Sequence, residues 1–542
     1  MLSPPLESAG QRTLLRVGLI LDSFLQPAWI IKIIQDIQSS DVAKIALVIK
    51  LEEASQSHWP AQIGRQPQNL LYQAYCKFDE QRNKTEKDAF KISSGESLLS
   101  ECPVIKAEKA GPDRTDHDSL DVALYFGSKS LRGNLLKIAK HGVWAYGMSR
   151  AEPFTGVWEV LKETPVTTST LEILAEEPAQ RKVIYRSYSS SNPFSVWKSR
   201  NHVYWKSSNF VMRQLKRLCQ EGPESLKESA SEPSHSELDR PPKRFEMAKC
   251  LFALTGRYVK YHLDKLYSIE QWFLAYRFNP QPLNSQNALS GLKVFMPPQD
   301  RFWADPFPVK HGDRYFIFFE EYLYEEKKGH IAVVEVDPYG RQGEVRIALE
   351  RDYHLAYPFI FRWKNDYYMI PETSQKRSVE LFRCISFPTK WQFEKTLLSN
   401  LQAVDATLAE INGLWWMFVS IASEGVTKNW DELSLFYAET PFGPWYPHEQ
   451  NPVKSDVRQS RPAGRLFAWN GDMYRPAQDC SKRYGYAISL NKIIRLNTEE
   501  YLEIEVSKML PKWHKKLLGT HTLNQEEYLT VTDGLIRRNI FF

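Results

Sequence analysis

The chain has 542 residues, of which 42% are apolar and 25% are charged, with 70 basic and 65 acidic side chains. This length exceeds the roughly 100–200 residues of one ordinary domain, so we expect two or three domains. The nearly balanced charge argues neither for nor against a partner, but the lack of a basic stripe argues against a nucleic-acid-binding protein. No apolar run approaches the ~20 residues of a membrane-spanning helix, so we expect no integral membrane segment.

The cysteines and the N-terminus indicate the compartment. The first residues lack the basic start and apolar run of a secretory signal, so we expect a cytoplasmic protein. The six cysteines have no paired spacing, which predicts neither a disulfide framework nor a zinc site. We expect no metal and no other cofactor. The cysteines are Cys76, Cys102, Cys219, Cys250, Cys384 and Cys480.

Residues 13–218 are predicted to form an α/β domain of Rossmann type. Residues 14–21 (LLRVGLIL) form a near-continuous apolar run, as in a strand buried on both faces of a parallel sheet. Residues 29–38 then gather isoleucines on one helical face, and residues 43–50 (AKIALVIK) indicate a second buried strand. A third strand and a further helix are predicted at residues 121–126 and 131–141.

Two connecting segments follow this domain. Residues 219–245 are rich in Ser, Glu and Pro and almost free of apolar side chains. Such a composition cannot offset the entropy of ordering, so we predict a flexible linker. Residues 246–300 look helical or mixed and are expected to lead into the last domain.

Residues 301–542 carry an internal repeat with a period of about 50 residues. Each copy has a short strand, a turn with Gly or Asn-Asp, and an aromatic-rich strand, which is the pattern of a β-hairpin. Further strand-like segments, such as residues 330–336 and 379–384, fill the intervals. Several strands per unit at this period are typical of a propeller blade. Five copies therefore predict an all-β, five-bladed β-propeller.

Equivalent positions of the five copies should meet around the central channel, because each blade places its innermost strand there. The residues that lead the copies are Asp305, Tyr357, Asp405, Arg461 and His521. The ends of the following strands contribute Glu320 or Glu321, Glu372, Ser420, Gln478 with Asp479, and Asp533. The repeat thus predicts carboxylates, an arginine and a histidine around one funnel.

This constellation suits sugar chemistry, which uses one carboxylate as base, one as acid with a raised pKa, and a third group that separates the two pKa values. We predict Asp305, Glu372 and Asp405 as the catalytic carboxylates. The arginines would pair with an anionic group such as phosphate, and aromatic rings would stack on the sugar. The predicted substrate contacts are Trp303, His354, Tyr357, Arg461, Arg475, Gln478, Asp479 and His521.

Structural roles for the same residues stay open at this point. A repeated Asp at the start of a blade can accept hydrogen bonds from the amides of the adjacent turn, and the two arginines can be ion-pair partners within the ring. Most aromatic side chains must fill the space between blades, since packed sheets need large side chains between them.

Several segments of the repeat region resemble a known family. They are WADPF (303–307), HLAYP (354–358), MIPET (369–373), GPWYPH (443–448), NP (451–452), RPAGR (461–465), RPAQDC (475–480) and YG (484–485). In combination they resemble the N-terminal domain of glucosamine inositolphosphorylceramide transferases, a domain related to the five-bladed propellers of glycoside hydrolase family 43. That resemblance implies a base at Asp305, a positioning or pKa-tuning role for Asp405 and an acid role for Glu372. The order of the carboxylates along the chain departs from the hydrolase pattern.

The N-terminal domain resembles a divergent formyltransferase domain. The resemblance rests on RVGLIL (16–21), DVALYFG (121–127) and GVWAYG (142–147), followed by Gly156. In active members the last of these strands carries Asn-x-His, whereas residues 144–146 here read Trp-Ala-Tyr. Aromatic side chains cannot replace an imidazole and an amide in proton transfer, so we expect the domain to have lost formyl transfer.

Three functions follow from these patterns. The first is glycosyl hydrolysis or transfer on a sugar or glycoconjugate, within glycan or glycolipid biosynthesis. The second is a glycan-binding or scaffold protein without catalysis, in which the N-terminal domain would bind a protein partner. The third is formyl transfer to an amino sugar, which would need catalytic side chains from elsewhere.

Overall fold

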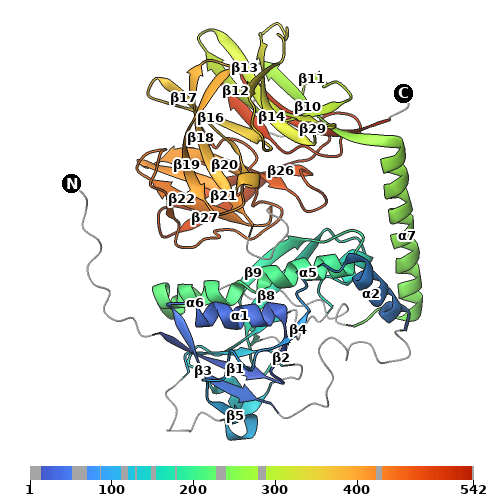
Figure 1. Ribbon diagram of the computed structural model, residues 1–542, viewed down its shortest axis with the longest axis vertical. Coiled ribbons are helices and arrows are strands. Elements are labelled where there is room, and N and C mark those ends of the chain that lie inside the picture. Colours follow the sequence, from blue (N-terminus) through green and yellow to red (C-terminus); the bar gives the residue numbers. More distant parts are fainter. Residues whose placement is uncertain are drawn as a thin grey trace, which may run out of the picture. The chain divides into compact units, whose positions relative to one another are not determined.

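The computed structural model describes residues 14–51, 70–85, 87–110, 120–127, 131–147, 154–177, 180–226, 240–278, 283, 288–422 and 430–539. By its internal contacts the chain divides into two compact units (Figure 1). The first consists of Met1–Ser187 and Ser191–Thr255, and the second of Tyr188–Ser190 and Gly256–Phe542. No helix among the described residues is long and apolar enough to cross a membrane.

The first unit is built on a mixed sheet with the strand order β5-β3-β1-β6-β7-β8-β9. The pairs β5–β3, β3–β1, β1–β6 and β6–β7 are parallel, and β8 runs antiparallel to β7. The strands are β1 (Leu15–Leu21), β3 (Ala43–Lys50), β5 (Val104–Lys106), β6 (Val122–Tyr125), β7 (Val143–Tyr146), β8 (Val166–Ile173) and β9 (Lys182–Ser190). A separate short pair consists of β2 (Leu25–Pro27) and β4 (Ile92–Ser94).

The predicted opening of this unit, two buried parallel strands joined by a helix, is confirmed. Helix α1 (Ala28–Gln38) buries its isoleucines in the same core as the central strand β1. The other helices are α2 (Leu70–Asn83), α4 (Trp158–Leu161), α5 (Val196–Ser207) and α6 (Phe210–Glu221). The helix expected at residues 131–141 is reduced to a short 3-10 turn, Gly133–Lys137, which begins at a glycine with φ of 67° that an α-helix does not accommodate.

Part of the expected linker is ordered. Helix α6 continues to Glu221, and a 3-10 turn, Gly222–Leu226, follows it. Residues 227–239, the middle of the expected linker, lie outside the described residues. Helix α7 (Arg244–Tyr267) comes next and leads directly into strand β10 (Ser268–Phe278).

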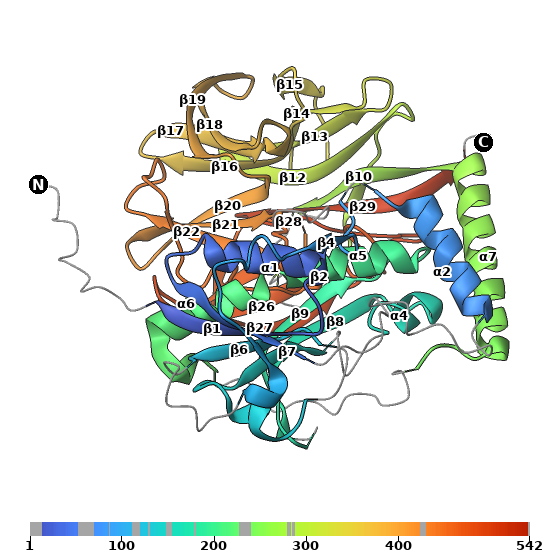
Figure 2. The same cartoon turned by 60° about the horizontal axis from the view of Figure 1, so that its bottom comes forward.

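The second unit contains five four-stranded antiparallel sheets, which are the five blades expected from the repeat (Figure 2). The first three blades are β12 (Arg301–His311) to β15 (Arg346–Leu349), β16 (Ala356–Trp363) to β19 (Lys390–Ser399), and β20 (Ala403–Ile411) to β23 (Tyr446–Pro447). Their middle strands are β13 (Arg314–Leu323), β14 (Lys328–Val336), β17 (Asp366–Glu372), β18 (Ser378–Ser386), β21 (Leu414–Ile421) and β22 (Leu433–Ala438). The fourth blade is β24 (Phe467–Trp469), β25 (Asp472–Asp479), β26 (Ala487–Leu496) and β27 (Tyr501–Met509).

The fifth blade joins the two ends of the repeat region. It has the order β11-β10-β29-β28, where β28 (Leu523–Glu526) and β29 (Leu529–Asn539) come from the end of the chain. Strand β10 pairs with β29 along its whole length, and β11 (Lys293–Phe295) completes the sheet. The blades therefore begin at Ser268 and not at the expected residue 301, and part of the expected lead-in is propeller sheet.

Aromatic and branched side chains fill the spaces between the blades. Trp303, for example, packs with Phe319 and Tyr276 in one buried cluster, while Trp415 packs with Tyr357 and neighbouring residues in another. The expectation that most aromatic residues of this region are blade core agrees with these clusters.

Candidate active site

The innermost strands of the first three blades share an unusual backbone feature. Asp305, Tyr357 and Asp405 have φ angles of 53°, 42° and 56°, in the left-handed region that non-glycine residues rarely adopt. At each of them the pairing with the second strand of the blade shifts register, as at a β-bulge. Strained backbone at equivalent points of three blades re-aims these side chains and is typical of functional sites. The lead residues of the first three copies of the repeat thus occupy equivalent positions in their blades.

A cavity of about 230 Å³ lies beside this ring of lead residues. Three of its lining side chains are lead residues of the repeat, namely Asp305, Arg461 and His521. The remaining lining residues are Trp272, Phe302, Ala304, Glu320, Tyr322, His354, Ala356, Glu372 and Tyr484. The cavity is therefore made of acids, bases and aromatic rings drawn from the second unit alone.

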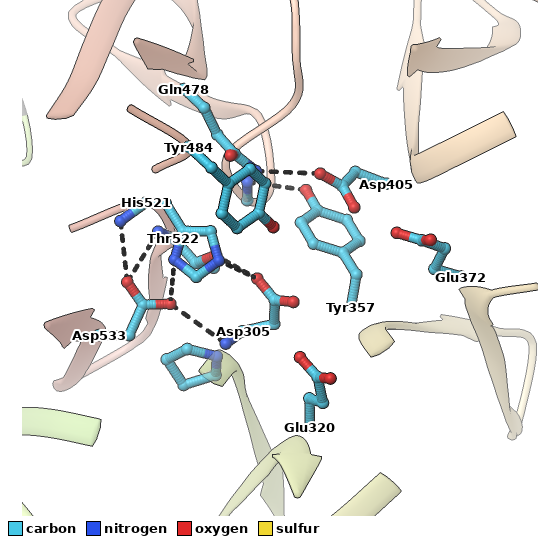
Figure 3. Close-up of polar contacts among 12 residues, drawn as sticks. Asp305, Glu320, Tyr357, Glu372, Asp405, Gln478, Tyr484, His521, Thr522 and Asp533 are labelled. Atoms are coloured by element: carbon cyan, nitrogen blue, oxygen red, sulfur yellow. Dashed lines mark hydrogen bonds and ion pairs between the residues drawn. The ribbon is translucent and has the colours of Figure 1, made fainter. Parts of the chain in front are cut away.

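Asp305 is held by the fifth blade (Figure 3). The Thr522 hydroxyl donates a hydrogen bond of 2.7 Å to Asp305 Oδ1, and His521 Nε2 lies 3.4 Å from the same oxygen. On its other side, His521 Nδ1 lies 2.8 Å from Asp533 Oδ2. Burial lowers the pKa of His521, but the two flanking carboxylates outweigh it and hold that pKa above its usual value. Burial, reinforced by Asp533, raises the pKa of Asp305.

Asp533 is a structural anchor for this chain of contacts. Its carboxylate accepts hydrogen bonds from three backbone N–H groups, those of Asp305, His521 and Thr522. Asp305, His521 and Asp533 also form a group whose ligand atoms lie within 4.8 Å of one another, as a metal site would require. Because the backbone N–H groups already occupy the Asp533 oxygens, the geometry favours a hydrogen-bonded network over a metal site.

Glu320 faces Asp305 from the second strand of the same blade, opposite Ala304 in the register. Its side chain is 8% exposed, and its Oε1 lies 3.6 Å from His354 Nε2. Burial, together with the nearby Asp305, Glu372 and Asp405, raises the pKa of Glu320 well above its usual value. This environment favours the protonated carboxylic acid.

The surroundings of His354 also favour its neutral form. Burial lowers its pKa, and its Nδ1 accepts a hydrogen bond of 2.9 Å from the Gly329 backbone N–H. A neutral imidazole whose Nδ1 accepts carries its proton on Nε2, the nitrogen that faces Glu320.

The Arg461 guanidinium contacts several protein side chains. Its guanidinium makes two contacts with Asp405, of 2.5 and 3.1 Å, and lies 3.4 Å from Glu372 Oε2. It also donates to the Tyr484 hydroxyl at 3.3 Å and lies over the Tyr484 ring. Gln478 donates a further hydrogen bond of 3.0 Å to Asp405. Burial raises the pKa of Asp405 to about 8, against the opposing effect of Arg461.

Aromatic rings form one wall of the cavity. The Trp272 ring lies over the His521 ring with centroids 4.1 Å apart, and the Tyr484 ring meets His521 edge-on at 5.4 Å. Trp272 belongs to β10, so the closing strand of the fifth blade contributes to the site. Such a wall offers a flat apolar face beside the carboxylates, as sugar-binding sites require.

The predicted site residues divide into three groups. Asp305, Glu372, His354, Arg461 and His521 line the cavity. Asp405 and Gln478 lie behind it, where they hold Arg461 and each other. Trp303, Tyr357, Arg475 and Asp479 do not line it.

Each of the four excluded residues has structural partners. Trp303 Nε1 donates to Glu321, and the Tyr357 hydroxyl bonds Thr407 and the backbone N–H of Gly464. Arg475 is fully buried within the fourth blade and pairs with Glu503 at 2.6 Å. Asp479 pairs with Lys508 at 3.0 Å.

Sequence reasoning gave no site role to Glu320, Trp272 or Tyr484. Glu320 was visible only as one of two adjacent glutamates at a strand end, and strand alternation could have separated them, because successive side chains point to opposite faces. Trp272 lay before the expected start of the propeller, and Tyr484 lies in a connection outside the repeat pattern.

On β7, aromatic side chains occupy the positions where active formyltransferases carry Asn-x-His. Trp144 and Tyr146 of β7 are fully buried, and the Tyr146 hydroxyl donates to the Ser207 carbonyl at 2.7 Å. The Trp29 ring packs edge-on against Tyr146 at 5.1 Å. The kinship of this unit to formyltransferases stays a prediction.

The chain is similar to known proteins in its propeller region. Residues 294–534 match the family model described as "Glucosamine inositolphosphorylceramide transferase 1, N-terminal", which confirms the resemblance expected for this part of the chain. A relative of that name from Oryza sativa subsp. japonica is 41% identical over 210 residues, and one from Arabidopsis thaliana is 35% identical over 208 residues. Each match covers 38% of this chain but only 28% and 27% of the respective relative.

Two of the solved structures that match this chain are carbohydrate-active enzymes. A family 117 glycoside hydrolase of Zobellia galactanivorans is 12% identical, with a TM-score of 0.32, and the match covers 50% of this chain and 91% of that one. An exo-1,5-alpha-L-arabinanase from a bovine ruminal metagenomic library is 13% identical, with a TM-score of 0.31 and coverage of 46% and 96%.

Proposed function

We propose that the cavity of the propeller is the active site of a carbohydrate-active enzyme, which transfers or hydrolyses a glycosyl group of a sugar conjugate. The observation that carries this proposal is the pair Asp305 and Glu320. Both line one small cavity, and their surroundings differ as those of a base and an acid do.

Asp305 is the proposed base. The Thr522 hydroxyl and the His521 imidazole fix the orientation of its carboxylate, and Asp305 lines the cavity in which we propose that the sugar binds. A positioned carboxylate of this kind accepts a proton from an attacking hydroxyl or water. Because its pKa is raised by burial, it is a stronger base than an exposed aspartate.

Glu320 is the proposed acid, in place of Glu372. A carboxyl group whose pKa is raised well above its usual value keeps its proton near neutral pH and can donate it to a leaving oxygen. Glu372 is a weaker candidate, because it accepts a hydrogen bond of 2.6 Å from Ser374 and lies beside the Arg461 guanidinium. Both contacts engage the Glu372 carboxylate with other protein groups.

The substrate group is proposed to be neutral or cationic. The guanidinium of Arg461 is already engaged by Asp405, Glu372 and Tyr484. A phosphate would have to compete with those contacts. An amine-bearing sugar would instead pair with the Asp305 or Glu372 carboxylate, and the name of the plant relatives contains glucosamine.

The test is turnover of a panel of sugar conjugates and nucleotide sugars, measured by mass spectrometry. Asp305→Asn and Glu320→Gln should each lower turnover by about 100-fold to 10,000-fold, the usual contribution of a general base or acid. Asp313→Asn, in the exposed turn that follows β12, is the matched control and should retain full turnover. Glu372→Gln should lower turnover less than Glu320→Gln does.

Two outcomes would contradict the proposal. Turnover that survives both Asp305→Asn and Glu320→Gln would place the chemistry elsewhere. Sugar that binds to wild type and variants alike, without conversion, would favour the glycan-binding function.

A further inference from the structure

Helix α7 carries an exposed apolar stripe that no other part of the described structure covers. Phe245 and Phe252 are 93% and 84% exposed, and Val259, Leu263 and Leu266 are about half exposed or more. Residues 245, 252, 259 and 266 are spaced by seven, and residue 263 is four after 259, so all five lie along one side of the helix. With 24 residues the helix (α7 in Figure 1) is about 36 Å long, and the exposed residues 245 to 266 span most of it.

The opposite side of the N-terminal half of the helix is anchored in protein. Met247 and Leu254 are buried, in a cluster that also contains Phe154 and Trp158. In this half of the helix the stripe is thus the exposed face, and the other face already packs against protein. Five large apolar side chains exposed on one face are unusual for a soluble surface and mark an interaction site.

The charges of α7 indicate the kind of partner. Both acidic side chains are neutralised by arginines outside the helix: Glu246 contacts Arg240 at 2.7 Å, and Asp264 contacts Arg537 at 2.6 Å. Lys249 and Lys260 are exposed, and neither forms an ion pair with any carboxylate in the described part of the chain. Lys249 follows Phe245 by four residues and Lys260 precedes Leu263 by three, so both lie at the edge of the stripe.

We propose that α7 lies flat on a lipid bilayer that contains anionic lipids, with the stripe inserted among the acyl chains and the two lysines at the headgroups. An apolar face of Phe and Leu bordered by lysine is the pattern of an interfacial helix. The surface of an anionic membrane attracts the unpaired lysines.

The experiment is co-sedimentation of the full-length protein with vesicles of phosphatidylcholine alone or of phosphatidylcholine with phosphatidylglycerol. Wild type should bind the anionic vesicles and should be released by salt. Phe245→Gln and Phe252→Gln should each weaken binding at least about tenfold, because each removes one phenylalanine ring from among the acyl chains of the bilayer. Lys249→Gln and Lys260→Gln should each weaken it about fivefold.

The matched controls lie on the propeller. Tyr339→Gln removes an aromatic side chain that is 86% exposed, and Lys390→Gln removes an exposed lysine. Both should bind vesicles as wild type does. The proposal is overturned if wild type does not sediment with anionic vesicles, or if the controls lose as much binding as the α7 variants. It is also overturned if α7 instead mediates dimerisation, seen as a wild-type dimer that Phe252→Gln converts to monomer without any vesicle binding.

Discussion

Removing the Arg461 side chain should destabilise the propeller strongly. Asp405 is 1% exposed, and its carboxylate is held by two guanidinium contacts of 2.5 and 3.1 Å and by Gln478 at 3.0 Å. In Arg461→Met the Asp405 carboxyl group would stay buried without its cationic partner, so it must either take up a proton or carry an uncompensated charge; breaking a buried pair in this way costs about 3–5 kcal/mol. Calorimetric unfolding of the propeller should show this loss as a lower free energy of unfolding.

A double variant separates the buried charge from simple loss of packing. In Arg461→Met/Asp405→Leu the Asp405 carboxylate is removed and only Glu372 still lacks its longer contact with Arg461, so the free energy of unfolding should recover part of the loss seen in Arg461→Met. Arg314→Met is the matched control, because its exposed pair with Glu335 is worth only about 0–1 kcal/mol. An Arg461→Met variant within about 1 kcal/mol of wild type, or a double variant no more stable than the single one, would refute this reasoning.

Three further predictions concern the blades and the cavity wall. Burial raises the pKa of Glu503, but Arg475 and Lys454 outweigh it and hold that pKa at about 2. In acid unfolding curves the stability deficit of Glu503→Gln relative to wild type should therefore be full above about pH 4.5 and shrink as pH falls toward 2. A deficit that does not depend on pH would contradict this. Trp272→Ala should weaken sugar binding in calorimetric titrations by roughly tenfold, since it removes the ring that forms the cavity wall; unchanged affinity would mean that the ring serves only the fold. Gly464→Ala should lower the unfolding temperature far more than Gly471→Ala, because both glycines have positive φ but only at Gly464 would a Cβ lie 2.2 Å from a backbone oxygen; equal losses would contradict the steric explanation.

The α/β opening and the five-fold repeat were readable in the sequence because each depends on local patterns. The apolar run that became β1 and the isoleucine face of α1 show periods that belong to single elements. The five lead residues recur because every blade repeats the same backbone path. Residues 268–278 were harder, since β10 is buried along most of its length and a continuous apolar run does not distinguish a strand from a helix.

The sequence by itself determined that Asp305, Arg461 and His521 would meet, because equivalent positions of blades converge on one channel. Only the tertiary structure decided which neighbours share the cavity. Arg475 belongs to the same repeat as Arg461 yet is paired with Glu503, which lies on another strand of its blade and follows it by 28 residues. The pKa of Glu320 is raised by burial beside three other carboxylates, and this effect depends on distances across blades that no local pattern contains.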